Sequence, residues 1–224
     1  MRLTFTVPFP VRLNRARLVL ALLPAALLLV APAARAQFGE PPTTQVHDAS
    51  ALKPPAGAKV AIVEFEDLEC PDCARANPLL KDAADKYHIP WIRHDFPLPM
   101  HSWSFQAAVN ARFFDTKSPA LGNEYRDSVF ASQISIETPD QLRQFTQKFA
   151  DAHKIVLPWA VDPMGKLEQE VKADFALGQR IGIEHTPTIW IVTNAAHAAP
   201  FVEVVDRSKL YQMIDTALAE SRGR

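Results

Sequence analysis

The chain has 224 residues, of which 22% are charged and 48% are apolar, and this balance fits one globular domain with or without an insertion. Its formal net charge is −1, so it lacks the basic excess of proteins that bind nucleic acid or anionic membranes. Two cysteines are too few for a scaffold held together by many disulfides.

The N-terminal 36 residues predict a secretory signal peptide. Arg12, Arg15 and Arg17 precede the uncharged apolar run Leu18–Val30, whose 13 residues fall short of the roughly 20 that a spanning helix needs. The sequence Ala-Arg-Ala at residues 34–36 then supplies small residues for a signal peptidase. We expect cleavage after Ala36 and export to the periplasm or a similar compartment, and a retained membrane anchor is the alternative.

Cleavage changes the charge of the chain and the meaning of its cysteines. Residues 1–36 hold five arginines and no acid, so the remainder has 19 basic and 25 acidic residues and a net charge of −6. We therefore expect no nucleic-acid partner. An exported chain also enters an oxidising compartment, where disulfides persist.

A lead-in, a strand and a helix are predicted after the signal peptide. Residues 37–58 are polar and proline-rich and predict an extended lead-in. Residues 59–66 are mostly apolar and rich in β-branched side chains, which is typical of a buried strand. A helix should follow, with Cys70 near its N-cap and Pro71 in its first turn. Pro78 lies inside this helix and predicts a kink.

The rest of the chain predicts a helical block followed by a return to strands. Residues 89–96 predict a second strand, and residues 100–181 have helical periodicity. Residues 188–194 and 201–206 predict two strands joined by a short loop, hence an antiparallel hairpin. The final helix is predicted to begin at Ser208. This order predicts an α/β domain with a helical insertion.

Two helix starts inside the helical block carry capping signals. Thr138 is predicted at an N-cap, with Pro139 at the first position and Gln141 at the third. A second helix is predicted to begin in the same way at Asp162 and Pro163.

Cys70 and Cys73 admit three interpretations: a structural disulfide, half of a zinc site, or a redox centre. A disulfide that closes so small a loop constrains the unfolded chain little. Zinc needs about four ligands, and the sequence has neither a second cysteine pair nor paired histidines at zinc-finger spacing, so we expect no metal. A cysteine at a helix N-terminus faces unpaired N–H groups that stabilise its thiolate, which favours redox chemistry with Cys70 as the nucleophile.

The motif Cys-Pro-Asp-Cys, at the end of a strand and the start of a helix, resembles the thioredoxin superfamily. Glu64 lies six residues before Cys70, Pro78 lies five residues after Cys73, and Thr186–Pro187 directly precedes a strand. These positions resemble the buried acid, the helix-kinking proline and the cis-proline loop of that superfamily. The helical block resembles the insertion of its DsbA-like branch. The resemblance covers roughly residues 55–222.

The resemblance implies a thioredoxin fold with a helical insertion between its βαβ and ββα halves. Residues 59–99 and 182–224 would form the thioredoxin-like domain, and residues 100–181 the insertion. It also implies a thiol–disulfide oxidoreductase without a cofactor, acting on cysteine-containing exported proteins and reset by a membrane or soluble redox partner. The lead-in of residues 37–58 is too short for a dimerisation domain, so we expect a monomer.

The resemblance also implies roles for the site residues. Cys70 would be the attacking or attacked sulfur and Cys73 the resolving one. Pro187 would be a cis-proline, and the Thr186 backbone would pair with a substrate peptide as an added strand. Glu64 would relay a proton to or from Cys73, with a pKa raised by burial. A strand acid turned to solvent is the alternative interpretation of Glu64.

Three residues are candidates for tuning the redox pair: Pro71 and Asp72 between the cysteines, and His185 before Thr186. The negative charge of Asp72 opposes a thiolate at Cys70. Further acids lie nearby in the sequence: Glu66, Asp67 and Glu69. We therefore expect a pair that is less oxidising than DsbA. His185 would stabilise the thiolate when protonated, and an ordinary loop histidine is the alternative.

The fold branch favours oxidation of substrate thiols as the direction of the reaction. Asp72 and Thr186 keep a disulfide reductase or isomerase as the alternative. A peptide-binding or chaperone module with a passive disulfide is the alternative from another functional class.

Overall fold

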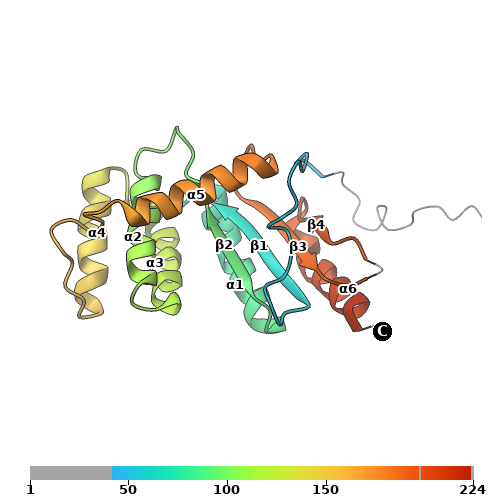
Figure 1. Cartoon of the computed structure of the whole chain (residues 1–224). Coiled ribbons are helices and arrows are strands. Elements are labelled where there is room, and N and C mark those ends of the chain that lie inside the picture. Colours follow the sequence, from blue (N-terminus) through green and yellow to red (C-terminus); the bar gives the residue numbers. More distant parts are fainter. Residues whose placement is uncertain (1–41, 197, 223–224) are drawn as a thin grey trace, which may run out of the picture. The chain divides into compact units, whose positions relative to one another are not determined.

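The computed structural model describes residues 42–196 and 198–222 (Figure 1). The predicted signal peptide lies outside the described residues. The elements are β1 (Val60–Glu66), α1 (Pro71–Tyr87), β2 (Trp91–Asp95), α2 (Ser104–Asp115), α3 (Pro119–Ser132), the 3₁₀ turn η1 (Gln133–Ser135), α4 (Pro139–Ala152), α5 (Lys166–Ile181), β3 (Thr188–Thr193), β4 (Phe201–Glu203), the 3₁₀ turn η2 (Arg207–Lys209) and α6 (Leu210–Arg222). Within these described residues, no helix is both long and apolar enough to cross a bilayer.

The four strands form one mixed sheet in the order β2-β1-β3-β4. β1 runs parallel to β2 and antiparallel to β3, and β3 pairs antiparallel with β4, so the predicted hairpin is confirmed. All seven residues of β1 are buried because it is a central strand covered on both faces. The predicted α/β fold is confirmed.

Alternate residues of β1 face two different cores. Val60 and Ile62 pack with side chains of α1 and α6, including Leu80 and Ile214. Ala61, Val63 and Phe65 pack on the opposite face with residues of α5 and with Leu52 of the lead-in. Figure 1 shows the same layering, with α1 and α6 on one side of the sheet and α5 on the other.

The helices α2 to α5 follow β2 and precede β3 in the sequence, and they form the predicted helical insertion. Their shared core is built from large side chains, including Trp103, Phe114, Tyr125 and Phe149. Cys70 and Cys73 belong to this same cluster. The cysteine pair therefore lies where the insertion packs against the end of β1 and the start of α1.

The lead-in packs against the sheet without forming a helix or strand in its described part, residues 42–58. Leu52 is buried in the core beneath α5. The backbone N–H and the hydroxyl of Thr44 donate to the carboxylate of Glu203 on β4 (3.0 Å each). These contacts attach the lead-in to the edge of the sheet.

Within the helical insertion, one predicted helix start is confirmed and one is wrong. α4 begins at Pro139 with the Thr138 hydroxyl accepting from the Gln141 amide, as predicted. α5 begins at Lys166 and not at Asp162, because Gly165 takes a left-handed conformation (φ 67°) that interrupts the helix. The Asp162 carboxylate instead reaches forward and accepts from the amides of Lys166 (2.9 Å) and Glu168 (2.8 Å).

The last helix and the last strand are both shorter than predicted. Residues Arg207–Lys209, around the predicted start at Ser208, form the 3₁₀ turn η2, and α6 begins only at Leu210. The Asp206 carboxylate accepts from the Ser208 amide (3.0 Å) and fixes this turn. β4 accordingly ends at Glu203, before the chain turns toward α6.

Candidate active site

Both cysteines are free thiols at the N-terminus of α1. Cys70 is the N-cap residue and Pro71 is the first residue of the helix, as predicted. The Cys70 thiol donates to the backbone carbonyl of Thr186 (Sγ–O 3.4 Å), and the backbone N–H of Asp67 donates to the Cys73 sulfur (3.5 Å). The pair is thus held from the loop before β3 and from the end of β1.

The two thiols have opposite acidities. The pKa of Cys70 is lowered to about 5, mainly by the hydrogen bond that the Cys73 side chain donates to its thiolate. Burial opposes this shift, and the backbone N–H groups of Cys73 and Asp72 add to it. Burial raises the pKa of Cys73 well above its usual value. At neutral pH the site therefore holds one thiolate beside one protonated thiol.

The Thr186–Pro187 peptide bond is cis, as the resemblance implied. Thr186 is buried and Pro187 is half-buried at the start of β3. The Thr186 carbonyl accepts a hydrogen bond from the Cys70 thiol, so the loop before β3 lies directly against the cysteine pair.

Glu64 is buried in β1, with an exposed fraction of 1%, so the alternative of a solvent-facing acid is wrong. Its Oε2 accepts from the indole N–H of Trp91 (2.9 Å), and Oε1 has no hydrogen-bond partner among the described residues. Burial, and then the charge of Glu66, raise the pKa of Glu64 to about 8. The charge of Glu64 in turn contributes to the raised pKa of Cys73.

Asp72 is not the unpaired negative charge that the sequence indicated. Its Oδ1 accepts from Nη2 of Arg207 (2.7 Å) and from Nε of Arg75 (3.2 Å). Burial opposes ionisation of Asp72, but the hydrogen bond and charge of Arg207, followed by those of Arg75, outweigh it and lower its pKa. Sequence reasoning missed Arg207, which no local motif marks.

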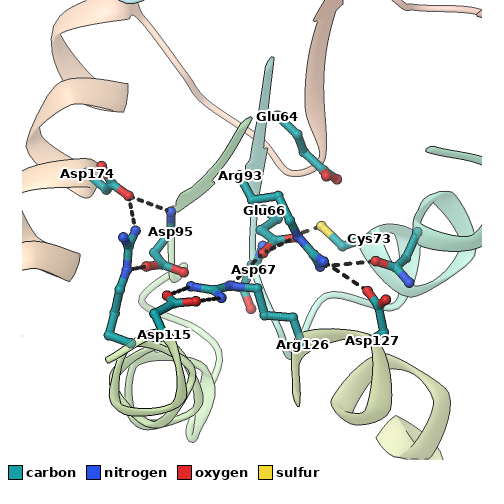
Figure 2. A network of polar contacts seen from close by, with 12 residues as sticks. Glu64, Glu66, Asp67, Cys73, Arg93, Asp95, Asp115, Arg126, Asp127 and Asp174 are labelled. Carbon is teal, nitrogen blue, oxygen red and sulfur yellow. Dashed lines mark hydrogen bonds and ion pairs between the residues drawn. The ribbon is translucent and has the colours of Figure 1, made fainter. Parts of the chain in front are cut away.

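The three neighbouring acids all have hydrogen-bond or ion-pair partners in the structure. Glu66 lies within a buried ion network, which Figure 2 shows: Arg93 donates to Glu66 (2.8 Å) and to Asp127 (2.9 Å). Arg126 of α3 extends this network to Asp115 (2.8 Å). The network joins the ends of β1 and β2 to the helical insertion.

Asp67 and Glu69 hold the loop between β2 and α2. The Asp67 carboxylate contacts Nδ1 of His101 (2.7 Å) and accepts from the amide of Leu98 (2.6 Å). Glu69 accepts from the amide of Trp103 (2.6 Å). These carboxylates therefore attach the loop between β2 and α2 to the turn between β1 and α1.

The insertion supplies one further contact that the sequence did not indicate. The side-chain amide of Gln133 in η1 donates to the carbonyls of Leu68 (2.9 Å) and Cys70 (3.1 Å). It fixes the turn between β1 and α1 from the helical insertion. Glutamine at a helix end is too common to signal this role in advance.

His185 lies next to the site in sequence but is exposed. Its backbone carbonyl accepts from the Thr188 hydroxyl (2.7 Å), and in the described part of the chain its imidazole makes no hydrogen bond or ion pair. Its role in tuning the thiolate stays a prediction. No cluster of three or more potential metal ligands occurs in residues 42–196 and 198–222.

A four-stranded sheet with a dithiol at the start of α1, together with helices inserted after β2, places the chain in the class of thioredoxin-fold proteins. A family model described as Thioredoxin matches residues 55–207, and the chain belongs to this family. No match was found among curated proteins.

Solved structures share the fold at low sequence identity. Wolbachia pipientis alpha-DsbA1 has a TM-score of 0.61 and 16% identity, with 82% of this chain and 94% of that chain covered. The thiol-disulfide exchange protein alpha-DsbA2 of the same organism has a TM-score of 0.57 and 18% identity over 73% of this chain and 84% of that chain. A periplasmic thioredoxin-like protein from Salmonella enterica serovar Typhimurium has a TM-score of 0.56 and 21% identity, covering 73% and 87%. The DsbA-like fold, with its helical insertion, is confirmed.

Proposed function

We propose that the protein is an exported thiol–disulfide oxidoreductase that exchanges a Cys70–Cys73 disulfide with cysteines of exported proteins. The observation that carries the proposal is the asymmetry of the two thiols, one with a pKa of about 5 and one with a pKa well above its usual value. Such a pair is suited to thiol–disulfide exchange, because the more acidic thiol is the better leaving group and the buried thiol stays protonated until it reacts.

We favour oxidation of the substrate as the direction. A substrate thiolate attacks the Cys70 sulfur, the Cys70–Cys73 bond breaks, and Cys73 leaves with the electron pair. A second substrate thiolate then attacks the substrate sulfur of the mixed disulfide and releases Cys70 as a thiolate. The substrate loses two electrons and forms a disulfide, and the protein gains two electrons as a dithiol. The low pKa of Cys70 favours this release.

Glu64 is proposed to give a proton to Cys73 when that sulfur leaves, and to take one when it attacks. A carboxyl group with a pKa of about 8 is largely protonated at neutral pH and can still ionise, which suits both transfers. The electrostatic effect of Glu64 on Cys73 supports this pairing.

The loop before β3 is proposed to bind the substrate peptide. The Thr186 carbonyl, which accepts a hydrogen bond from Cys70 while that thiol is protonated, would accept a backbone N–H of an extended peptide during exchange.

The test is exchange with a reduced, unfolded model protein that needs disulfides to refold. Wild-type protein in the disulfide form should restore the activity of the model protein, and the Cys70→Ser variant should not. Cys73→Ser should accumulate a mixed disulfide at Cys70, visible by mass spectrometry, which would identify substrates in an extract. A Cys70→Ser variant that retains full activity would refute the proposal and favour a binding module with a passive disulfide.

The reduction potential of the Cys70–Cys73 pair distinguishes an oxidant of substrate thiols from a disulfide reductase. We expect a value between those of DsbA, about −120 mV, and of protein disulfide isomerase, about −180 mV, by equilibration with glutathione. A value near that of thioredoxin, about −270 mV, would instead make the protein a reductase.

Export, cleavage after Ala36, a monomeric state and a separate redox partner that resets the pair remain part of the proposal. N-terminal sequencing of the protein from the exported fraction should begin at Gln37. A retained leader would turn the soluble enzyme into a membrane-anchored one.

A further inference from the structure

Arg207 of η2 holds both the side chain and the main chain of the residue between Pro71 and Cys73. Its Nη2 donates to the Asp72 carboxylate (2.7 Å), and its Nη1 donates to the Asp72 backbone carbonyl (3.2 Å). The turn that carries Arg207 is itself fixed by Asp206, whose carboxylate accepts from both the amide and the hydroxyl of Ser208. The contact joins positions 135 residues apart in the sequence.

The main-chain contact acts on a peptide group that touches the reactive thiol. The Asp72 carbonyl and the Cys73 N–H belong to one peptide unit, and that N–H is among the groups that stabilise the Cys70 thiolate. A guanidinium that binds the carbonyl end polarises the unit and strengthens the N–H as a donor. It also fixes the first turn of α1 in the orientation that points its N–H groups at Cys70.

The contact between Arg207 and the Asp72 carboxylate changes the net charge beside the cysteines from negative to positive. Arg75 also binds the Asp72 carboxylate (3.0 Å), so two cations surround one anion and the cluster carries one net positive charge. Arg75 comes from the same helix and its side chain is 67% exposed, whereas Arg207 comes from η2 and is only 32% exposed. Since solvent weakens exposed ion pairs, Arg207 is the more effective partner.

We infer that Arg207 is a positioning residue of the redox pair, which converts Asp72 from a charge that opposes the Cys70 thiolate into part of a cationic clamp that stabilises it. The inference rests on the proposed function, because a stabilised thiolate has a consequence only where thiols exchange. It predicts that Asp72 and Arg207 are energetically coupled, so that substituting one changes the effect of substituting the other on the ionisation of Cys70.

The test measures the ionisation of Cys70 by the ultraviolet absorbance of its thiolate, in the reduced protein and without any substrate. Arg207→Ala should raise the midpoint by roughly half a pH unit, which lowers the ratio of thiolate to thiol at a fixed pH about threefold. Arg207→Lys, which keeps the charge but not the two-pronged contact, should lie between wild type and Arg207→Ala. Lys209→Ala is the matched control, because it removes a cation from the same turn that pairs with Asp206 (3.5 Å).

The same measurement in an Asp72→Asn background tests the coupling. Without its carboxylate anchor, Arg207 is no longer held over the peptide group, so Arg207→Ala should then change the midpoint by less than half as much. Equal midpoints in wild type, Arg207→Ala and Lys209→Ala, with unchanged circular dichroism, would overturn the inference. Failure of wild-type protein to exchange thiols with a model substrate would refute the proposed function alone, because the ionisation readout needs no substrate.

Discussion

Replacing Glu64 by glutamine tests whether a neutral acid lies beneath the cysteines. Glutamine has nearly the same shape, and its carbonyl can accept the hydrogen bond that the Trp91 indole donates to the carboxylate. The substitution therefore removes the ability to ionise and little else. We expect Glu64→Gln to be more stable than wild type at alkaline pH and almost equally stable in acid.

The magnitude follows from the two pKa values of this group. The pKa is 4.5 in an unperturbed chain and about 8 in the fold, and each pKa unit is worth about 1.36 kcal/mol. Because the folded pKa is raised, the fold keeps its full stability below pH 4.5 and loses it as the pH rises to about 8. Between about pH 5 and about pH 9, wild type should lose roughly 4 kcal/mol relative to Glu64→Gln.

The assay is urea denaturation of both reduced proteins across this pH range. The ionisation of Cys70 affects both proteins alike and therefore cancels in the difference. Glu170→Gln, at an exposed position of α5, is the control and should show no such widening. A difference between wild type and Glu64→Gln that stays constant or narrows as the pH rises would refute the assignment of a buried, neutral Glu64.

Three further predictions follow from the site and its supports. The thiolate absorbance of reduced wild-type protein should appear with a midpoint near pH 5 and vanish in Cys70→Ser; a midpoint above 8 would contradict the stabilised thiolate. Arg93→Met leaves Glu66 buried without its closest cation and should lower the free energy of unfolding by roughly 3 to 5 kcal/mol in urea, whereas a loss below about 1 kcal/mol would contradict a dry ion network. Gly178→Ala would bring its Cβ to 2.5 Å from the Phe96 ring and should cost roughly 1 to 3 kcal/mol by thermal melting, whereas an unchanged melting temperature would contradict this close packing.

The order of elements was predictable because each leaves a local signal. The apolar residues of β1 and β3, the Thr138 cap of α4 and the proline at the start of α1 depend on near neighbours alone. The dithiol could likewise be predicted from the spacing of Cys70 and Cys73. The start of α5 was missed because it depends on a left-handed glycine, whose conformation the sequence does not specify.

The electrostatics of the site could not be predicted in the same way. Asp72, as read in the sequence, is an acid inside a thiol motif, and its charge opposes the thiolate. In the structure its nearest cation is Arg207, brought there by the turn before α6. Glu66, at the end of β1, likewise obtains its cation Arg93 from the neighbouring strand. The electrostatic environment of each acid depends on cations that the fold brings close to it. A sequence pattern does not contain the distances between such residues.

Cys70 obtains its surroundings from the far end of the chain. Its thiol contacts Thr186, 116 residues later, and the adjacent motif residue contacts Arg207, later still. Because synthesis runs from the N-terminus and folding follows it, both cysteines exist long before these partners do. Until β3 and η2 have folded, Cys70 lacks the Thr186 contact and Asp72 lacks the Arg207 contact. Completion of the C-terminal half is therefore the event that brings both partners to the cysteine pair.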